Sequence, residues 1–599
     1  MLLDAPTTET PRRPAICSGA GNGTGARELR PGASPQTRLI ARFLPSLTDL
    51  AFLMPVIFLF VKLGGARSLL GDGDTGWHVR TGEWILANHR VPHADIFSFS
   101  RPGAPWFAWE WLWDVIFAML HQRWGMAAVV LASLSVICLS GALLFRLIRR
   151  KCENGLVAIA VTLLATGGCA IHWLARPHLF TILFLIVTLH ITDRAAGGAS
   201  EPGRTGLPRS PVLLFWLIPL TLLWTNLHGG FFVVFLVLAC YIGGDLLNAA
   251  IEADPGRRRE FLRNLKPWTI AFAACFAVTF INPYGWQLHK HVVEYISDPY
   301  QLQHIQEFQA PDFHSPAVVY FEPLMILAIL TALWDARHRR FAEVFLGMGW
   351  LHLALIAQRN LPLFAVAASP TVARAIAELM RHAAAPVSSS LAPWLGRSAR
   401  WLEQATAGFE ETDRIRRVHL AAVLPLALVG AVLLATPSVA GVADSKFIST
   451  YDPKTFPEKA LPVLLSPDTR RIFAADQWGD YLIYHLYPAR KVFIDGRSDF
   501  YGAAFGLRYL DVFNVQHGWQ KTLDKYQIDT IAIAPQCALT QALKISPDWR
   551  VVHDDGVTVV FRRNPGDPRS LVTSDEGKDR DRAITKTITR DPPITQPTT

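Results

Sequence analysis

Cysteine and the usual metal-site spacings are scarce in this sequence. Its 599 residues include seven cysteines, and these form no CxxC pair and no spacing from which a disulfide framework can be drawn. No HExxH or comparable histidine spacing is present, so the sequence names no metal centre. The first forty residues are rich in Pro, Gly and Arg but lack the apolar core of a cleaved signal peptide. We therefore expect residues 1–46 to be a disordered cytoplasmic tail.

Apolar sequence is abundant instead. Hydrophobic residues make up 51% of the chain and its mean hydropathy is positive, which is too apolar for an ordinary soluble protein. The net charge of +9 would suggest nucleic acid as the partner of a soluble chain. In a membrane protein, Lys- and Arg-rich cytoplasmic loops give the same excess. We therefore expect a polytopic protein of the lipid bilayer with no nucleic-acid partner.

Apolar runs long enough to cross the hydrocarbon core predict roughly eleven transmembrane helices within residues 47–437. They are expected at 47–64, 124–147, 155–172, 179–193, 211–226, 229–249, 267–283, 318–334, 341–358, 361–380 and 418–437. A short aromatic segment at 111–121 is expected to lie in the membrane interface.

Basic residues orient these helices. With the N-terminus inside, the Lys and Arg clusters at 38–42, 146–151, 257–266 and 337–340 all fall on the cytoplasmic side. The first long loop, 65–123, then lies outside, together with several short loops and the region 440–565.

The region 440–565 differs in character from the membrane segments. Short β-rich runs at 492–494, 530–533 and 557–561 alternate with helical stretches, which predicts a small extracytoplasmic α/β domain. The fold class is thus an α-helical polytopic membrane domain followed by an α/β domain. Residues 566–599 are charged and rich in Thr and Pro, and we expect a disordered tail.

The stretch 72–86, directly after the first apolar run, crowds acids, an imidazole, an arginine and indoles into the first outer loop. Asp74 is the leading candidate for a general base, because an interfacial cavity can tune its pKa. Glu110, where the loop re-enters the membrane, is the second catalytic candidate. The alternative is that Asp72 and Asp74 form turns with the adjacent glycines. A turn does not require the neighbouring side chains, which are substrate-binding candidates: Trp77, His78 and Arg80.

Further polar residues lie at the outer ends of separate helices, where the topology predicts a shared cavity. Arg176 and Arg359 can bind the phosphate of a lipid-linked donor, or else anchor the chain on phospholipid headgroups. The remaining substrate-binding candidates at these helix ends are His178, His228 and Asn360. For the histidines, interfacial hydrogen bonding is the alternative role.

Three other acidic segments are interpreted as structural. Asp95 is expected to form a turn or a helix cap. In the C-terminal region, 476–481 and 493–499 concentrate acids, glycine and aromatics after strands. Strand ends can bind ligands, but tight turns need the same residues, and we favour turns.

The pattern resembles the GT-C superfamily of lipid-phosphate-sugar-dependent glycosyltransferases, which includes oligosaccharyltransferases, protein O-mannosyltransferases and aminoarabinose transferases. The shared features are a multi-helix membrane domain, an acid soon after the first helix (Asp74), a second acid near the re-entry (Glu110) and a soluble C-terminal domain. The chain lacks the WWDYG motif of oligosaccharyltransferases and shows no clear metal-binding acid pair. The segments 74–86, 92–98, 109–112, 478–482 and 494–497 are similar to a group of bacterial multi-pass proteins.

The resemblance implies an inverting glycosyltransferase at the outer face of a bacterial inner membrane. It would move a sugar from a polyprenyl-phosphate-linked donor to a lipid, glycan or protein acceptor. Asp74 would be the base, Arg176 or Arg359 would hold the lipid phosphate, and Glu110 would position substrate or assist Asp74. No cofactor is assigned, and a requirement for a divalent metal, Mg²⁺ or Mn²⁺, stays open.

Two functions of other classes remain as alternatives. A multi-pass transporter would need ionisable groups near mid-bilayer and an internal repeat. A non-catalytic scaffold for cell-envelope polysaccharide handling would depend on the C-terminal domain and not on Asp74.

Overall fold

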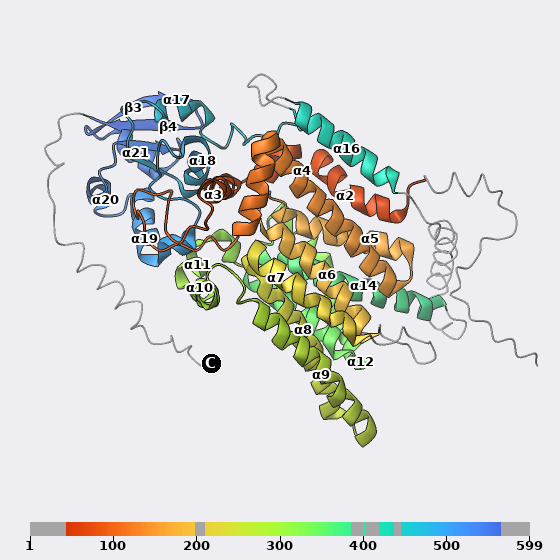
Figure 1. Cartoon of the computed structure of the whole chain (residues 1–599). Coiled ribbons are helices and arrows are strands. Elements are labelled where there is room, and N and C mark those ends of the chain that lie inside the picture. Colours follow the sequence, from red (N-terminus) through yellow and green to blue (C-terminus); the bar gives the residue numbers. More distant parts are fainter. Residues whose placement is uncertain (1–43, 198–209, 385–400, 402–418, 437–444, 565–599) are drawn as a thin grey trace, which may run out of the picture.

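The computed structural model describes residues 44–197, 210–384, 401, 419–436 and 445–564. Within these ranges a large helical bundle carries a small α/β domain at one end (Figure 1). Of the two expected disordered tails, residues 1–43 and 566–599 lie outside the described residues.

Helices occupy each of the ranges expected to cross the membrane. They are α2 (Leu47–Val61), α4 (Trp111–Cys152), α5 (Gly155–Cys169), α6 (His178–Ala196), α7 (Leu217–Leu227), α8 (Val233–Ile251), α9 (Pro255–Val278), α12 (Phe321–Arg337), α13 (Phe341–Ile356), α14 (Leu361–Ala384) and α16 (Leu420–Ala435). Among the described residues, five helical segments are long and apolar enough to cross a membrane, and shorter apolar helices accompany them. The predicted fold class is confirmed.

Helix α4 is broken near its start. Gly125 has φ of 69°, a left-handed conformation that only glycine adopts without cost. The break separates residues 111–124 from the long apolar helix, in agreement with the separate aromatic segment predicted there. The separated segment packs against α3 (Asp74–Asn88). Glu110 and Asp114 are thereby brought beside the helix that begins at Asp74.

The first outer loop contains more helix than the sequence suggested. Residues 74–88 form α3, so Asp74 opens a helix and is not part of a glycine turn. Most of the first half of α3 is buried, because the bundle covers one side and α18 (Asp476–Leu486) of the C-terminal domain packs on the other. A carboxylate in the first turn is favoured by the helix dipole.

The C-terminal domain is built on a four-stranded sheet in the order β1-β2-β4-β3. Strands β1 (Ile472–Ala474) and β2 (Thr530–Ile533) are parallel, whereas β3 (Trp549–Asp554) and β4 (Val559–Arg563) join antiparallel. The other helices of the domain are α17 (Leu461–Leu464), α19 (Ser498–Phe513), α20 (Trp519–Lys525) and α21 (Ala538–Lys544).

The strand predicted at 492–494 is wrong. Val492 makes only isolated bridges, to Ile472 of β1 and to Ser98 of the first outer loop. The chain then turns, because Asp495 and Arg497 are held in a buried ion pair at 2.7 Å. Val492 therefore connects the loop 65–123 to the edge of the sheet.

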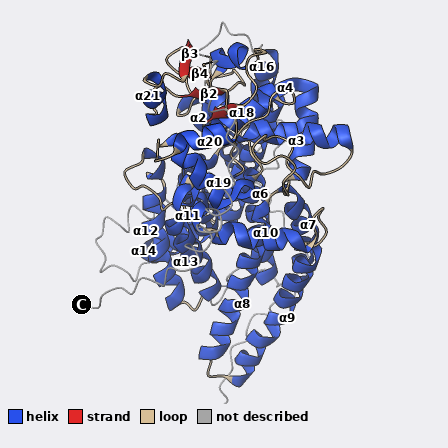
Figure 2. Ribbon diagram, turned by 90° about the vertical axis from the view of Figure 1, so that its left-hand side faces the viewer, coloured by secondary structure: helices blue, strands red, loops and turns tan. Residues whose placement is uncertain are grey.

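The end of the molecule opposite the sheet carries clusters of basic residues. The sheet lies at one end, and the hairpin of α8 and α9 projects from the other (Figure 2). The basic cluster 257–266 belongs to the start of α9. Basic residues of α4 and of the loop before α13 meet acids at this end, where Lys151 pairs with Asp193 at 3.1 Å and with Glu343 at 3.6 Å.

Candidate active site

A polar cavity of about 210 Å³ lies where the helical bundle meets the C-terminal domain. Its walls come from α3, the first outer loop, the start of α6, helix α10 (Trp286–Ser297), the residues before α14 and the segment 496–499. The predicted site residues that line it are Asp74, Trp77, His78, Glu110, Arg176, His178, His228, Arg359 and Asn360. Side chains from distant parts of the sequence therefore converge on one site.

Arg80 is the predicted site residue that does not line this cavity. Its Nε donates to the carbonyl of Tyr484 at 2.7 Å, and its Nη1 pairs with Glu83 at 2.6 Å. Arg80 therefore connects α3 to α18.

Arg176 is surrounded by acids, in a group that we call the cavity cluster: Asp72, Asp74, Arg176 and Glu307. Its guanidinium lies 2.6 Å from Asp74, 2.8 Å from Asp72 and 3.2 Å from Glu307. Burial raises the pKa of Asp72 to about 7, although Arg176 opposes the shift. Burial also acts on Glu307, but there Arg176 prevails and holds the pKa well below its usual range. Three acids thus share one guanidinium.

Two carboxylate oxygens of the cavity cluster remain unsatisfied. Asp72 Oδ1 and Asp74 Oδ1 are buried, and neither has a hydrogen-bond donor among the described residues. Buried acceptors without donors are rare in folded proteins and call for an explanation. Both oxygens can therefore accept a hydrogen bond from a further proton donor.

Glu110 lies between two imidazoles. Its carboxyl is 3.6 Å from His78 Nε2 and 3.5 Å from His228 Nε2, and Asp114 holds the other nitrogen of His78 at 2.6 Å. Burial raises the pKa of Glu110 to about 8, and burial together with Arg359 and Arg176 lowers the pKa of His228 to about 3. At neutral pH Glu110 therefore carries a proton that it can donate to a substrate oxygen, while His228 is uncharged.

Arg359 is the cation of the cavity that is least engaged by acids. It lies over the ring of Phe308 at 4.5 Å and has the Tyr295 hydroxyl as a hydrogen-bond partner. Within the described ranges it makes no ion pair at 4.0 Å or less. Of the two arginines proposed from the sequence to hold a phosphate, Arg359 is better placed, because Arg176 is already occupied by three carboxylates.

The C-terminal domain closes the cavity through a second arginine, in a group that we call the interface cluster: Asp95, Asp495, Arg497 and Tyr501. Arg497 pairs with Asp95 at 2.8 Å and with Asp495 at 2.7 Å, and the Tyr501 hydroxyl donates to Asp495 at 2.8 Å. Asp95 also accepts bonds from the backbone of residues 97 and 98. The structural interpretation of Asp95 agrees with this geometry.

Among the cavity-lining residues not predicted from the sequence are Tyr295, Glu307 and Asp499, and Asp114 contacts the lining residue His78. Asp114 stands in the aromatic segment after Glu110, where its single charge was a usable signal. Asp499 pairs with His291 at 3.0 Å, a contact between elements about two hundred residues apart that no local pattern indicates.

We assign no metal site among the described residues. They contain no group of three His, Cys, Asp or Glu side chains arranged to hold a metal ion. We therefore assign no step to Mg²⁺ or Mn²⁺.

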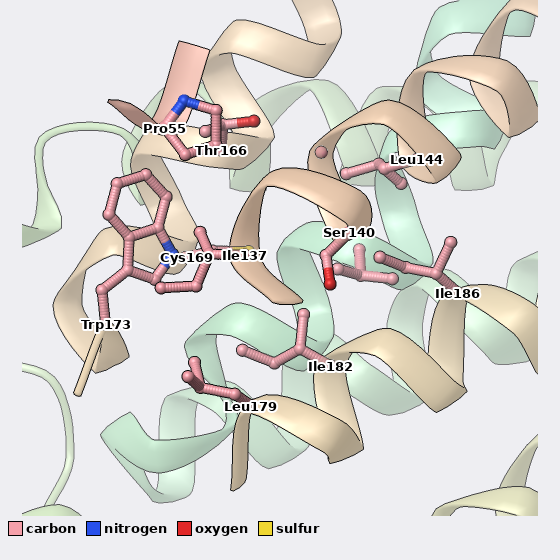
Figure 3. Close-up of a pocket in the computed structure, with 12 residues that line it drawn as sticks. Pro55, Ile137, Ser140, Leu144, Thr166, Cys169, Trp173, Leu179, Ile182 and Ile186 are labelled. Carbon is pink, nitrogen blue, oxygen red and sulfur yellow. The ribbon is translucent and has the colours of Figure 1, made fainter. Parts of the chain in front are cut away.

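A second, apolar cavity of about 20 Å³ lies within the helical bundle (Figure 3). Trp173, Leu179 and Ile182 line it, and Ile182 also lines the polar cavity. A space of this size holds at most one water, and apolar cavities stay dry. Ile182 is the lining residue that the two cavities share.

No family model and no curated protein matches this sequence. Among solved structures, it is similar to the archaeal oligosaccharyltransferase AglB from Archaeoglobus fulgidus in complex with an inhibitory peptide and a dolichol-phosphate. The identity is 12%, the TM-score is 0.48, and the match covers 82% of this chain and 69% of that one. ArnT from Cupriavidus metallidurans in the apo state matches with 15% identity, a TM-score of 0.43 and coverage of 86% and 96%.

Proposed function

We propose that this protein is a membrane glycosyltransferase that moves a sugar from a polyprenyl-phosphate-linked donor to an acceptor at the extracytoplasmic face of a bacterial inner membrane. One observation carries the proposal. Acids, imidazoles and guanidinium groups from distant segments converge on one cavity, at the end of the bundle that also carries the C-terminal domain. The basic α8–α9 hairpin at the other end (Figure 2) supports a cytoplasmic location for that end.

Asp74 acts as the general base in this proposal. Its Oδ2 is held by Arg176 at 2.6 Å, which orients the carboxylate. Asp74 takes the proton of an acceptor hydroxyl as the acceptor oxygen bonds to the anomeric carbon. The bond from that carbon to the lipid phosphate breaks in the same step, so the phosphate leaves with the electron pair and the anomeric configuration inverts.

Arg359 and Glu110 serve the leaving group and the sugar. Arg359, whose guanidinium is not engaged by an acid within the described ranges, neutralises the charge that develops on the lipid phosphate. Glu110, protonated at neutral pH, donates a hydrogen bond to a substrate oxygen and accepts from His228. The bound geometry then brings the base and the anomeric carbon within reach of the same hydroxyl.

Replacement of Asp74 by Asn tests the proposal, because Asn preserves the shape but cannot accept the proton. Purified protein in proteoliposomes is supplied with undecaprenyl-phosphate-linked sugars, and release of undecaprenyl phosphate is followed. We expect a loss of about 10²- to 10⁴-fold in rate, with unchanged binding of undecaprenyl phosphate. The variant Asp312→Asn, which changes an exposed acid, is the matched control. Full activity of Asp74→Asn would show that another group is the base.

A further inference from the structure

Asp480, on α18 of the C-terminal domain, faces the helix that begins at Asp74. The two helices are joined on both sides of this acid. The backbone N–H of Gly73 donates to Gln477 Oε1 at 3.0 Å, and Arg80 donates to the carbonyl of Tyr484 at 2.7 Å. Residues 477, 480 and 484 share one helix face, so Asp480 is directed onto the start of α3. Its side chain is completely buried, and that of Asp74 is nearly so.

One oxygen of each acid lies against the same glycine. A side-chain carbon placed on Gly496 would be 2.6 Å from Asp74 Oδ1 and 2.6 Å from Asp480 Oδ2. The N–H of Gly496 donates to the other oxygen of Asp480 at 2.8 Å. Asp74 Oδ1 and Asp480 Oδ2 are both buried without a donor among the described residues, although the two side chains are within hydrogen-bond reach of each other. Two unsatisfied acceptors thus face one another.

A single proton shared by Asp74 Oδ1 and Asp480 Oδ2 would let one carboxyl donate a hydrogen bond to the other. Adjacent buried carboxylates cannot both ionise, and one of them then keeps its proton. Within the described ranges the guanidinium of Arg176 pairs with Asp74 and not with Asp480, so the shared proton is assigned to Asp480. Asp480 instead faces further acidic groups, Asp495 and Tyr451. Burial, Asp74 and Asp495 together raise the pKa of Asp480 well above its usual range.

We propose that Asp480 is a positioning residue, whose protonated carboxyl donates a hydrogen bond to Asp74 Oδ1 and so lets the C-terminal domain orient the base. The role of Asp74 as base rests on the proposed function. The shared proton is a property of the fold and can be tested without turnover.

Infrared spectroscopy of the full-length protein in detergent detects this proton directly. At neutral pH we expect, beside the band of protonated Glu110, a protonated-carboxyl C=O component that is absent from Asp480→Asn and shifted in Asp74→Asn, because the latter loses the charged partner. The exposed Asp511→Asn is the control and keeps the band. If Asp480→Asn leaves the carboxyl band of the wild-type protein unchanged, Asp480 is ionised and the proposal is overturned.

Activity separates hydrogen bonding from charge. The amide of Asp480→Asn still donates to Asp74, so we expect transfer within about threefold of wild type, whereas Asp480→Leu loses about 10- to 100-fold. Thermal unfolding of both variants identifies any loss that comes from misfolding. If a folded Asp480→Asn is as inactive as Asp480→Leu, the site needs a second carboxylate, as for a bound cation, and the proposal fails.

The outcomes also distinguish this inference from the proposed function. An active Asp74→Asn with the shifted carboxyl band would remove Asp74 as the base but leave the shared proton in place. If Asp74→Asn is inactive and the wild-type protein shows no carboxyl band from Asp480, Asp74 stays the base and the shared proton is ruled out.

Discussion

Two buried arginines hold acids where the helical bundle meets the C-terminal domain, and they leave those acids in different states. In the interface cluster around Arg497, each oxygen of Asp95 and Asp495 accepts hydrogen bonds. In the cavity cluster around Arg176, one oxygen of Asp72 and one of Asp74 lack a donor within the described ranges. The carboxylate oxygens are therefore all satisfied in the interface cluster, although Arg497 Nη1 is buried there without an acceptor among the described residues, whereas two carboxylate oxygens of the cavity cluster are not.

The difference indicates what each cluster does. A buried acceptor without a donor costs free energy, so a cluster that only held the fold would be expected to satisfy its oxygens. The interface cluster meets that expectation and fastens the first outer loop to the C-terminal domain. In the cavity cluster, Asp72 Oδ1 lacks a donor within the described ranges and Asp74 Oδ1 depends on the proposed proton of Asp480, so these acids are suited to proton transfer.

The largest effect should come from breaking the interface cluster. Arg497→Leu leaves Asp95 and Asp495 buried without their counter-charge, and we expect a loss of about 3–5 kcal/mol in unfolding free energy. Thermal unfolding in detergent and protease sensitivity of the C-terminal domain measure it. The exposed Arg470→Ala is the control, with an expected change below about 0.5 kcal/mol. If Arg497→Leu leaves the unfolding free energy and the protease sensitivity unchanged, other contacts hold the C-terminal domain in place.

A cavity arginine should instead affect ligand binding. Arg359→Gln removes the cation proposed for the lipid phosphate, and we expect undecaprenyl phosphate to bind about 10- to 100-fold more weakly, with little change in stability. Equilibrium binding in detergent measures the affinity. Arg257→Gln, at the opposite end of the bundle, should bind as wild type does. Equal affinity in Arg359→Gln would remove Arg359 from the phosphate site.

The raised pKa of Glu110 in the cavity should also appear as a pH dependence of stability. The pKa of Glu110 is raised from 4.5 to about 8 in the folded protein, so between these values the folded state binds more protons than the unfolded state. Stability therefore falls as pH rises through this window, by up to about 1.4 kcal/mol per pH unit. In Glu110→Gln the thermal midpoint should decline less steeply as pH rises. The exposed Glu458→Gln should not, and an identical decline in both variants would contradict the assignment.

The smallest effect concerns Arg80, which lies outside both clusters. Arg80→Met loses its bonds to the Tyr484 carbonyl and to Glu83, and we expect a cost of about 1 kcal/mol in stability. The KM for the lipid-linked donor should stay at the wild-type value. A raised KM with unchanged stability would place Arg80 in the substrate site after all.

Charge asymmetry and apolar runs were sufficient to predict much of this molecule. They located the apolar helices and assigned Asp74, Glu110, Arg176, His228 and Arg359 to one face, and the structure places all of these on one cavity. The reason is physical, because polar side chains at helix ends on one face of a bundle lie close together and gather around a common cavity.

Long-range pairs could not be predicted in the same way. Arg497 and Asp95 are 402 residues apart in sequence, and Asp480 meets Asp74 only because α18 packs on α3. The acids at 476–480 looked like turn formers because local sequence describes neighbours along the chain and not partners across an interface. The failed strand at 492–494 has the same origin, since its pairing is decided by Ser98 and by the ion pair that follows.

The contact of Val492 with Ser98 and Ile472 has a consequence for biogenesis. The first outer loop is made early, whereas its partners Arg497 and Asp495 are made about four hundred residues later. At about 5–20 residues per second of synthesis, the loop waits roughly 20–80 s for them. During that interval its aromatic and acidic side chains lack their final cover. Assembly of the cavity is therefore among the last events of biogenesis, so a chain truncated before residue 492 is expected to insert its early helices without acquiring a site.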